Sequence, residues 1–271
     1  MASTDASETQ YEMLKRLELS DADHHALQDR CRARGVHFLS AAFDQDGVRY
    51  LDSLGLPVVK VPSGEITNLP YLKAVAACRK PVFLSTGMST LEEIGAALEI
   101  IGKGVEVTLL HCTTEYPCPF DNVNLRAMVS MREHFGLPVG YSDHTCGIEV
   151  AVAAVAMGAS VIEKHFTLDR SMKGPDHRAS IEPDALKRMV ASIRNAERAM
   201  GNGVKAPMAV EMKNIAVVRK SIVAKVRIRQ GEPLTVDNLT VKRPGTGISP
   251  MRWDEIVGTV AQRDYEPDDL I

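Results

Sequence analysis

The sequence lacks a long apolar run and a strong excess of charge, and both absences exclude classes of protein. Its 32 basic and 35 acidic residues give a formal net charge of −3, too weak a field to indicate binding to nucleic acid. The longest weakly polar run, residues 148–162, contains Glu149 and is too short to span a bilayer. We therefore expect no nucleic-acid partner and no membrane insertion.

Cysteine is also scarce, and residues 1–11 lack the basic and apolar segments of a signal peptide. The five cysteines are odd in number and include no C-x-x-C pair, which argues against a disulfide framework and against a zinc ribbon. These features together predict a protein of the reducing cytoplasm.

Short apolar runs alternate with helix patterns along most of the chain. Helix signals flank several segments between the runs: Ser20 and Gly35 bracket residues 21–34, a capping box at residues 89–92 begins another helix, and Pro183 opens residues 184–200. This alternation predicts an α/β protein with a parallel sheet covered by helices. The predicted strands are residues 36–39, 58–61, 82–84, 105–110, 139–141 and 160–163.

Polar residues follow five successive predicted strands, which favours a barrel over a doubly wound sheet. The carboxyl ends of barrel strands all feed one site, whereas a doubly wound sheet gathers its site near one switch point. A closed barrel has eight strands, but we find six, and the first 35 residues contain only helix patterns. We predict a TIM-type (β/α)8 barrel lacking its first two βα units, over residues 1–203.

The character of the sequence changes after Gly203. Residues 204–215, with Pro207, are predicted to be a linker, and residues 216–271 a small β-rich domain. Within that domain, residues 221–224 and 239–241 have the composition of short strands between turn-rich segments.

Two histidines, His144 and His165, end neighbouring predicted strands. Two imidazoles leave coordination positions for water and substrate, as a catalytic metal site requires. The alternative is a pair of ordinary hydrogen-bonded histidines. Asp143 and Glu163 beside them are either groups that orient the ligands or simple strand-end caps.

A second candidate site begins at Lys60, where a cation, the hydroxyl of Ser63 and the carboxylate of Glu65 follow one strand. Such a set suits phosphate binding and proton transfer by Glu65. The alternative is a tight turn with a solvated lysine. Two further loops, around Asp176 and Arg243, are candidates for substrate contacts or plain surface turns.

Seven motifs, in order and spacing, resemble the family of bacterial N-acetylneuraminate (sialic acid) synthases. They are KVPSGEITN at residues 60–68, LSTGM at 84–88, HCTTEYP at 111–117, GYSDHT at 140–145, EKHFTLD at 163–169, GPDH at 174–177 and KRPGTG at 242–247. The resemblance implies a barrel followed by an antifreeze-like (SAF) domain, and a divalent metal such as Mn²⁺, with Mg²⁺ or Co²⁺ as alternatives. It also implies condensation of phosphoenolpyruvate with N-acetylmannosamine to form N-acetylneuraminate and phosphate, or the related synthesis of legionaminic acid.

The resemblance implies a role for each matching residue. Phosphoenolpyruvate is expected to contact Lys60, Ser63 and Ser142. The metal is expected to bind His144 and His165, and the sugar to contact Tyr116, Asp176 and Arg243. Lys60, Glu65 and His165 are the expected catalytic residues, and Thr114 is a further substrate contact at a position that is asparagine in some members. Arg243 would act in the partner's site of a domain-swapped homodimer.

Two departures from the family pattern leave other hypotheses open. The family's first two strands, with a catalytic glutamate and a phosphate-binding lysine, normally precede the position where this sequence begins, so we expect a shortened barrel. Ala41 stands where the family has a phosphate-contacting hydroxyl. One alternative is therefore a non-catalytic remnant that binds sugar or dimerises. Another is a sugar-phosphate synthase, which the SAF-like domain disfavours.

Overall fold

The structure is a computed structural model that describes residues 9–271. Residues 1–8, at the start of the predicted barrel domain, lie outside the described residues. The chain divides into two compact units, Met1–Gly201 and Asn202–Ile271. Within the described part of the chain, no helix has both the length and the apolar character needed to cross a membrane.

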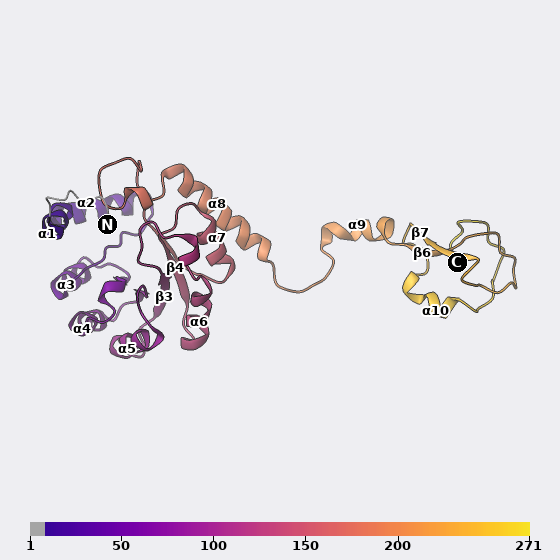
Figure 1. The fold of residues 1–271 in the computed structure, drawn as a ribbon, viewed down its shortest axis with the longest axis horizontal. Coiled ribbons are helices and arrows are strands. Elements are labelled where there is room, and N and C mark those ends of the chain that lie inside the picture. Colours follow the sequence, from indigo (N-terminus) through magenta and orange to yellow (C-terminus); the bar gives the residue numbers. More distant parts are fainter. Residues whose placement is uncertain (1–8) are drawn as a thin grey trace. The chain divides into compact units, whose positions relative to one another are not determined.

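The first unit is built on a five-stranded parallel sheet whose strands follow one another in chain order. Figure 1 shows the sheet curving as an arc, with helices on its outer side. The strands are β1 (Val59–Val61), β2 (Val82–Ser85), β3 (Val107–Cys112), β4 (Val139–Asp143) and β5 (Ile162–Lys164). The helices of this unit are α1 (Gln10–Leu17), α2 (Asp21–Arg34), α3 (Gln45–Ser53), α4 (Leu69–Cys78), α5 (Leu91–Ile101), α6 (Arg126–Phe135), α7 (Glu149–Ala156) and α8 (Pro183–Met200), with 3-10 turns η1 (Ser63–Glu65), η2 (Phe120–Asn122) and η3 (His177–Ala179).

The helix boundaries follow from local capping. The hydroxyl of Ser20 accepts a hydrogen bond from the N–H of Asp23 at the start of α2, and Thr90 does the same for Glu93 at the start of α5. Gly35 ends α2 in the left-handed region at φ 68°, which an L side chain rarely adopts. The predicted helices at 21–34 and 184–200 are confirmed.

The main apolar core lies between the sheet and its helices, and a smaller separate cluster joins α7 and α8. Val61, Leu84 and Leu109 on successive strands are fully buried in the main core, and so are Tyr71 of α4 and Met128 of α6. Parallel strands that are covered in this way consist of near-continuous apolar residues, which is why the strands could be recognised from the sequence. The predicted α/β class with a partial TIM-type barrel is confirmed.

The predicted strand at residues 36–39 is wrong. Residues 36–39 form no strand, and only Ala41, two residues further on, makes an isolated parallel bridge with Lys60. Val36 and Leu39 are exposed, and α2 buries none of its residues. A strand at this edge has β1 as its one neighbour. Although Phe38 makes a ring contact with His24 of α2, Val36 and Leu39 stay exposed, so burial does not offset the entropy of ordering the segment.

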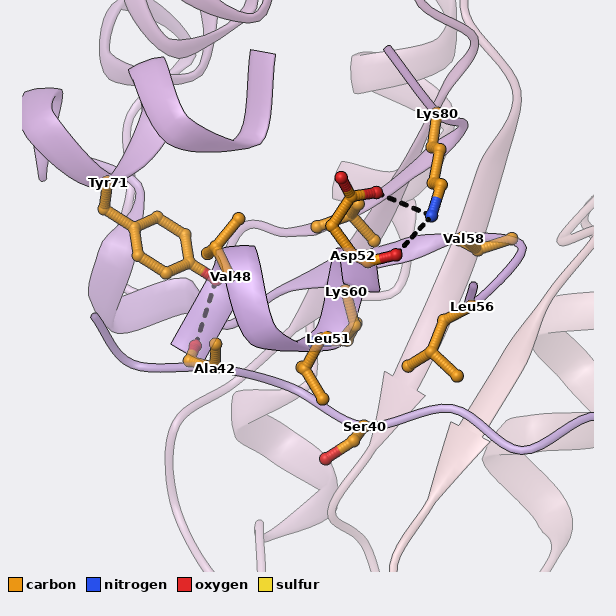
Figure 2. A pocket seen from close by; sticks show the side chains of 11 residues that line it. Ser40, Ala42, Val48, Leu51, Asp52, Leu56, Val58, Lys60, Tyr71 and Lys80 are labelled. Carbon is orange, nitrogen blue, oxygen red and sulfur yellow. Dashed lines mark hydrogen bonds and ion pairs between the residues drawn. The ribbon is translucent and has the colours of Figure 1, made fainter. Parts of the chain in front are cut away.

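A small cavity lies beside this edge of the sheet, as Figure 2 shows. It is lined by Ala42, Val48 and Tyr71 among others, and the Tyr71 hydroxyl donates a hydrogen bond to the Ala42 carbonyl oxygen at 3.0 Å. Its volume of about 10 Å³ leaves room for one water molecule at most. The cavity is therefore too small to hold a substrate.

The second unit begins with α9 (Ala209–Val218) and contains an antiparallel pair, β6 (Ser221–Ala224) and β7 (Leu239–Lys242), followed by η4 (Pro250–Arg252) and α10 (Trp253–Ile256). The predicted short strands at 221–224 and 239–241 are thus present. The segment predicted as a linker is helical from Ala209 onward, because the Glu211 carboxylate accepts a hydrogen bond from the Met208 N–H at 2.7 Å and caps the helix. Ile222, Ile228 and Leu234 form part of a separate core.

Candidate active site

Four side chains with complementary chemistry lie on one face of the parallel sheet. The register pairs Lys60 with Phe83 and Ser142 with Glu163. Ser85 is two residues after Phe83, and side chains alternate along a strand, so Ser85 shares the face of Lys60. The strand ends therefore bring a cation, two hydroxyls and a carboxylate together.

Direct contacts join these four groups. Lys60 Nζ donates a hydrogen bond to Ser85 Oγ at 2.9 Å and lies 3.5 Å from Glu163 Oε2. Ser142 Oγ donates to Glu163 Oε1 at 2.7 Å. The Lys60 side chain is 14% exposed and that of Glu163 is 41% exposed, so the cluster is enclosed on the lysine side and open to solvent at the carboxylate. We call Lys60, Ser85, Ser142 and Glu163 the anion cluster.

Ser85 and Glu163 are absent from the predicted site residues, although both stood in motifs that carried the resemblance. Glu163 was interpreted only as an orienting group or a cap. A period-two count assigns each side chain to one face of its own strand, but only the register between strands shows that this face is shared with Lys60 and Ser142.

A second group of side chains surrounds Gly87, in the loop after β2. A Cβ atom at Gly87 would overlap Thr114 Oγ1 and would lie 2.9 Å from Cys112 Sγ and 3.0 Å from Ser63 Oγ. Only glycine allows the backbone to approach these groups so closely. The predicted substrate contacts Ser63 and Thr114, from two different loops, are therefore brought together around this glycine.

The two histidines predicted as metal ligands are neighbours. The ring centroids of His144 and His165 are 5.4 Å apart, and the Tyr116 ring lies 4.1 Å from the first and 5.4 Å from the second. His144 Nδ1 lies 2.7 Å from the Thr113 carbonyl oxygen. A carbonyl only accepts, so this contact assigns the proton of the neutral ring to Nδ1 and leaves Nε2 free as a ligand.

Burial sets the protonation of this region. It lowers the pKa of His144 and raises the pKa of Tyr116 to about 12, so that the first is a neutral imidazole and the second a phenol at neutral pH. It also raises the pKa of the Cys112 thiol. The charge of Glu163 acts on all three groups: it adds to the raised pKa values of Cys112 and Tyr116 and opposes the lowered pKa of His144. The anion cluster, the Gly87 loop and the histidines therefore form one electrostatic region.

Neutral imidazoles are suitable ligands for a divalent metal, and the residues present fit such an ion to that extent. Asp176 Oδ2 lies 3.6 Å from His165 Nδ1. Among the described residues, no group of three or more His, Cys, Asp or Glu side chains is arranged to hold a metal. The protein ligands would be the two histidines, and water or substrate would supply the remaining oxygens.

A buried ion pair holds the strand ends that carry both histidines. Lys164 Nζ lies 2.6 Å from Asp143 Oδ2, and the two side chains are 3% and 0% exposed. Lys164 also donates to the Thr145 carbonyl oxygen at 2.8 Å, while Asp143 Oδ1 accepts from the Thr145 N–H and hydroxyl. Since His144 and His165 directly follow these two residues, the pair fixes the backbone at both positions.

The other two predicted site residues are positioned by local contacts. Glu65, in η1, accepts a hydrogen bond at 2.6 Å from Asn68, the residue that caps α4. Arg243 belongs to the second unit, where its Nε donates to the Val218 carbonyl oxygen at 2.9 Å. The two Nη nitrogens of its guanidinium take no part in that hydrogen bond, so they can still donate to a carbonyl or carboxylate.

The fold and the site together define a class: a partial α/β barrel with a Lys-Ser-Ser-Glu cluster and a histidine pair at its strand ends, followed by a small β-rich domain. The chain belongs to the NeuB family, whose model matches residues 1–205, and residues 219–271 match the SAF domain.

The family assignment is supported by named relatives. The chain is 50% identical to the N,N'-diacetyllegionaminic acid synthase of Campylobacter jejuni, over 100% of this chain and 82% of the relative. It is 46% identical to the enzyme of the same name from Legionella pneumophila, over 93% and 73%. Among solved structures, the N-acetylneuraminic acid (sialic acid) synthetase of Leptospira borgpetersenii is 32% identical, with a TM-score of 0.72 over 78% of this chain and 75% of that one.

Proposed function

We propose that this protein condenses phosphoenolpyruvate with a 2-acetamido sugar to form a nonulosonic acid and phosphate. The observation that carries the proposal is the anion cluster beside the histidine pair, in a chain of the NeuB family. Lys60 supplies a fixed positive charge, and the hydroxyls of Ser85 and Ser142 supply hydrogen bonds to a phosphate or carboxylate. Ser63 and Thr114, around Gly87, extend this surface.

The reaction requires groups at fixed positions that neutralise negative charge and transfer protons. The enol carbon of phosphoenolpyruvate attacks the aldehyde carbon of the open-chain sugar, water adds to C2, and phosphate leaves with cleavage of its C–O bond. Lys60 offsets the negative charge on the phosphate, and Glu65 accepts and returns a proton as the water adds. Tyr116 and Asp176 bind the sugar beside the histidines.

A divalent metal, for which we propose Mn²⁺, would be held by His144 and His165. When bound, it polarises the sugar carbonyl as a Lewis acid. The hydrogen bond from His144 Nδ1 to the Thr113 carbonyl and the Asp143–Lys164 pair hold the ligands in place. We also propose a homodimer, in which the partner's Arg243 completes each site by binding the N-acetyl group of the sugar.

For the product, we propose N,N'-diacetyllegionaminic acid. The sequence alone favoured N-acetylneuraminate, but the 50% and 46% identical relatives both bear the name of the legionaminic acid enzyme. That product carries two N-acetyl groups, so the acceptor would be a 2,4-diacetamido sugar. N-acetylneuraminate remains the second candidate because the Leptospira relative, at 32% identity, carries that name.

The test is phosphate release by the 271-residue chain with phosphoenolpyruvate, Mn²⁺ and either N-acetylmannosamine or its 2,4-diacetamido relative, with and without a chelator. We expect chelator-sensitive turnover, with a higher kcat/KM for the diacetamido sugar. Faster turnover of N-acetylmannosamine would instead indicate that the product is N-acetylneuraminate. A folded chain that binds sugar but releases no phosphate with either acceptor would support the non-catalytic alternative.

His144→Gln tests the role of the proposed metal ligand, and His134→Gln is its matched control. His134 lies on α6 and takes no part in the site, so its replacement should preserve turnover. Loss of Mn²⁺ binding in the first variant alone would tie the metal to His144.

A further inference from the structure

The carboxylate of Glu163 fills the position at which an anion would be bound by the anion cluster. One of its oxygens accepts the hydrogen bond from Ser142 at 2.7 Å, and the other lies 3.5 Å from the Lys60 ammonium. These are the two kinds of contact that a phosphate or a substrate carboxylate would make with the same residues. The protein thus contains an anion of its own on its anion-binding face.

A second anion cannot share these donors without a cost. Lys60 is mostly buried, and its remaining hydrogen bonds go to Ser85 and to the Val61 carbonyl oxygen. Two negative charges a few ångströms apart in a partly enclosed region repel each other strongly. Glu65, the other carboxylate near this strand end, is held by Asn68 and not by Lys60.

We propose that Glu163 is an internal counter-ion, which neutralises Lys60 in the free protein and is displaced when phosphoenolpyruvate binds. The inference rests on the proposed function for the identity of the incoming anion. Glu163 is 41% exposed while Lys60 is 14% exposed, so the carboxylate has room to move and the lysine does not. Release of Glu163 breaks its hydrogen bond with Ser142 and frees that hydroxyl for the substrate.

The exchange gives the site selectivity among anions. An anion must supply acceptor oxygens for both Lys60 and Ser142 to compensate for the contacts that Glu163 loses. Phosphate monoesters and carboxylates with several oxygens meet this condition, and chloride does not. The internal counter-ion therefore keeps simple salts out of the site while admitting an enolpyruvyl phosphate.

The experiment measures the affinity of the metal-free 271-residue chain for inorganic phosphate and for phosphoenolpyruvate by isothermal titration calorimetry. The variant is Glu163→Gln, which keeps the shape and an acceptor for Lys60 but removes the charge. We expect it to bind phosphate about tenfold more tightly than the unmodified chain, or better. The matched control is Glu115→Gln, an equal charge change in an exposed position of the loop after β3, with less than a twofold effect.

A double variant locates the effect. Glu163→Gln combined with Lys60→Met should lose the gain in phosphate affinity, because the uncovered charge is that of Lys60. Circular dichroism spectra confirm that each variant is folded.

The outcomes separate this inference from the proposed function. Equal or weaker phosphate binding by Glu163→Gln, in a folded protein, would overturn the counter-ion role and leave the synthase proposal intact. An equal gain in Glu115→Gln would reduce the effect to net charge and overturn the inference as well. If no variant binds either anion at tens of millimolar, no anion site exists, and both proposals fail.

Discussion

At the scale of single residues, the site depends on side chains that fix the positions of the two histidines. Asp143 and Lys164 are the main example, because they are buried, oppositely charged and directly adjacent in sequence to the two histidines. A buried ion pair adds little net stability over an apolar pair, but breaking it leaves an uncompensated charge. Its value here is geometric, since it fixes the ends of β4 and β5 relative to each other.

Replacing Lys164 with methionine should therefore be costly. Asp143 would remain buried without its cation, and we expect the free energy of unfolding to fall by about 3–5 kcal/mol, with Mn²⁺ binding weakened by about tenfold or more. Urea unfolding followed by far-UV circular dichroism and Mn²⁺ titration measure the two effects. The double variant with Asp143→Asn should recover part of the stability, since asparagine is neutral and still accepts from Thr145. A loss below about 1 kcal/mol would contradict the role of the pair.

Gly87 offers a test of the close approach between the loops. An added methyl group would overlap Thr114 Oγ1 and crowd Cys112 Sγ and Ser63 Oγ, so Gly87→Ala should displace the surrounding loops. We expect the KM for phosphoenolpyruvate to rise about tenfold or more, with a smaller change in the KM for the sugar. The control is Gly95→Ala within α5, where the new methyl group meets only Phe135 at 3.8 Å and alanine favours the helix. Equal KM values in Gly87→Ala and the unmodified protein would refute the prediction.

At the scale of secondary structure, the loop after β3 is anchored to its own strand by a buried polar contact. His111, near the end of β3, donates a hydrogen bond from Nε2 to the Val123 carbonyl oxygen at 2.7 Å, just beyond η2. The bond ties down the segment that carries Thr114 and Tyr116. Burial lowers the pKa of His111 below its ordinary value, so the folded protein holds the ring neutral.

The lowered pKa predicts how stability depends on pH. As the pH falls below about 6.5, the unfolded chain binds a proton at His111 before the folded chain does. The neutral ring therefore makes its full contribution to the free energy of unfolding above about pH 6.5. This contribution is lost as the pH falls towards the pKa of His111 in the folded protein, at up to about 1.4 kcal/mol per pH unit. His111→Gln keeps a donor for Val123 and does not titrate. Urea unfolding at pH 7.0 and 5.5 should show a shallower loss in this variant, and identical losses would rule out the effect.

At the scale of the whole molecule, the two units have separate apolar cores. Val61, Leu72 and Leu109 belong to the core of the first unit, while Leu234 and Tyr265 belong to that of the second. The single tryptophan, Trp253, packs against the second core. Tryptophan fluorescence therefore reports unfolding of the SAF domain, and helical circular dichroism mainly reports the barrel.

Separate cores predict separable unfolding. Leu234→Ala, at a site 3% exposed, should destabilise the SAF domain by about 2–5 kcal/mol, and lower the Tm of the fluorescence transition without shifting the dichroism transition. Leu72→Ala in the barrel should do the reverse. A common shift of both signals in either variant would show that the two units unfold as one.

Much of the fold could be predicted from the sequence because its signals are local. The cap of Ser20, the glycine after α2 and the apolar strands each act within a few residues, and five of the six predicted strands are present. The sixth, at residues 36–39, has strand composition but makes no ladder, because strand formation depends on neighbours along the whole length and not on propensity. The helix at α9 was missed because its cap by Glu211 follows a proline-containing segment that has the composition of a linker.

For the site, the sequence by itself determined which chemical groups are available and at which strand ends: Lys60, Ser142, His144 and His165 all follow from motif and spacing. The tertiary structure alone decided which of these groups meet, because contacts across strands depend on register. Ser85 and Glu163 join Lys60 and Ser142 only because alternate residues of neighbouring parallel strands share one face of the sheet. The same pleat turns Asp143 and Lys164 to the opposite face, where they pair in the interior instead of taking part in the chemistry.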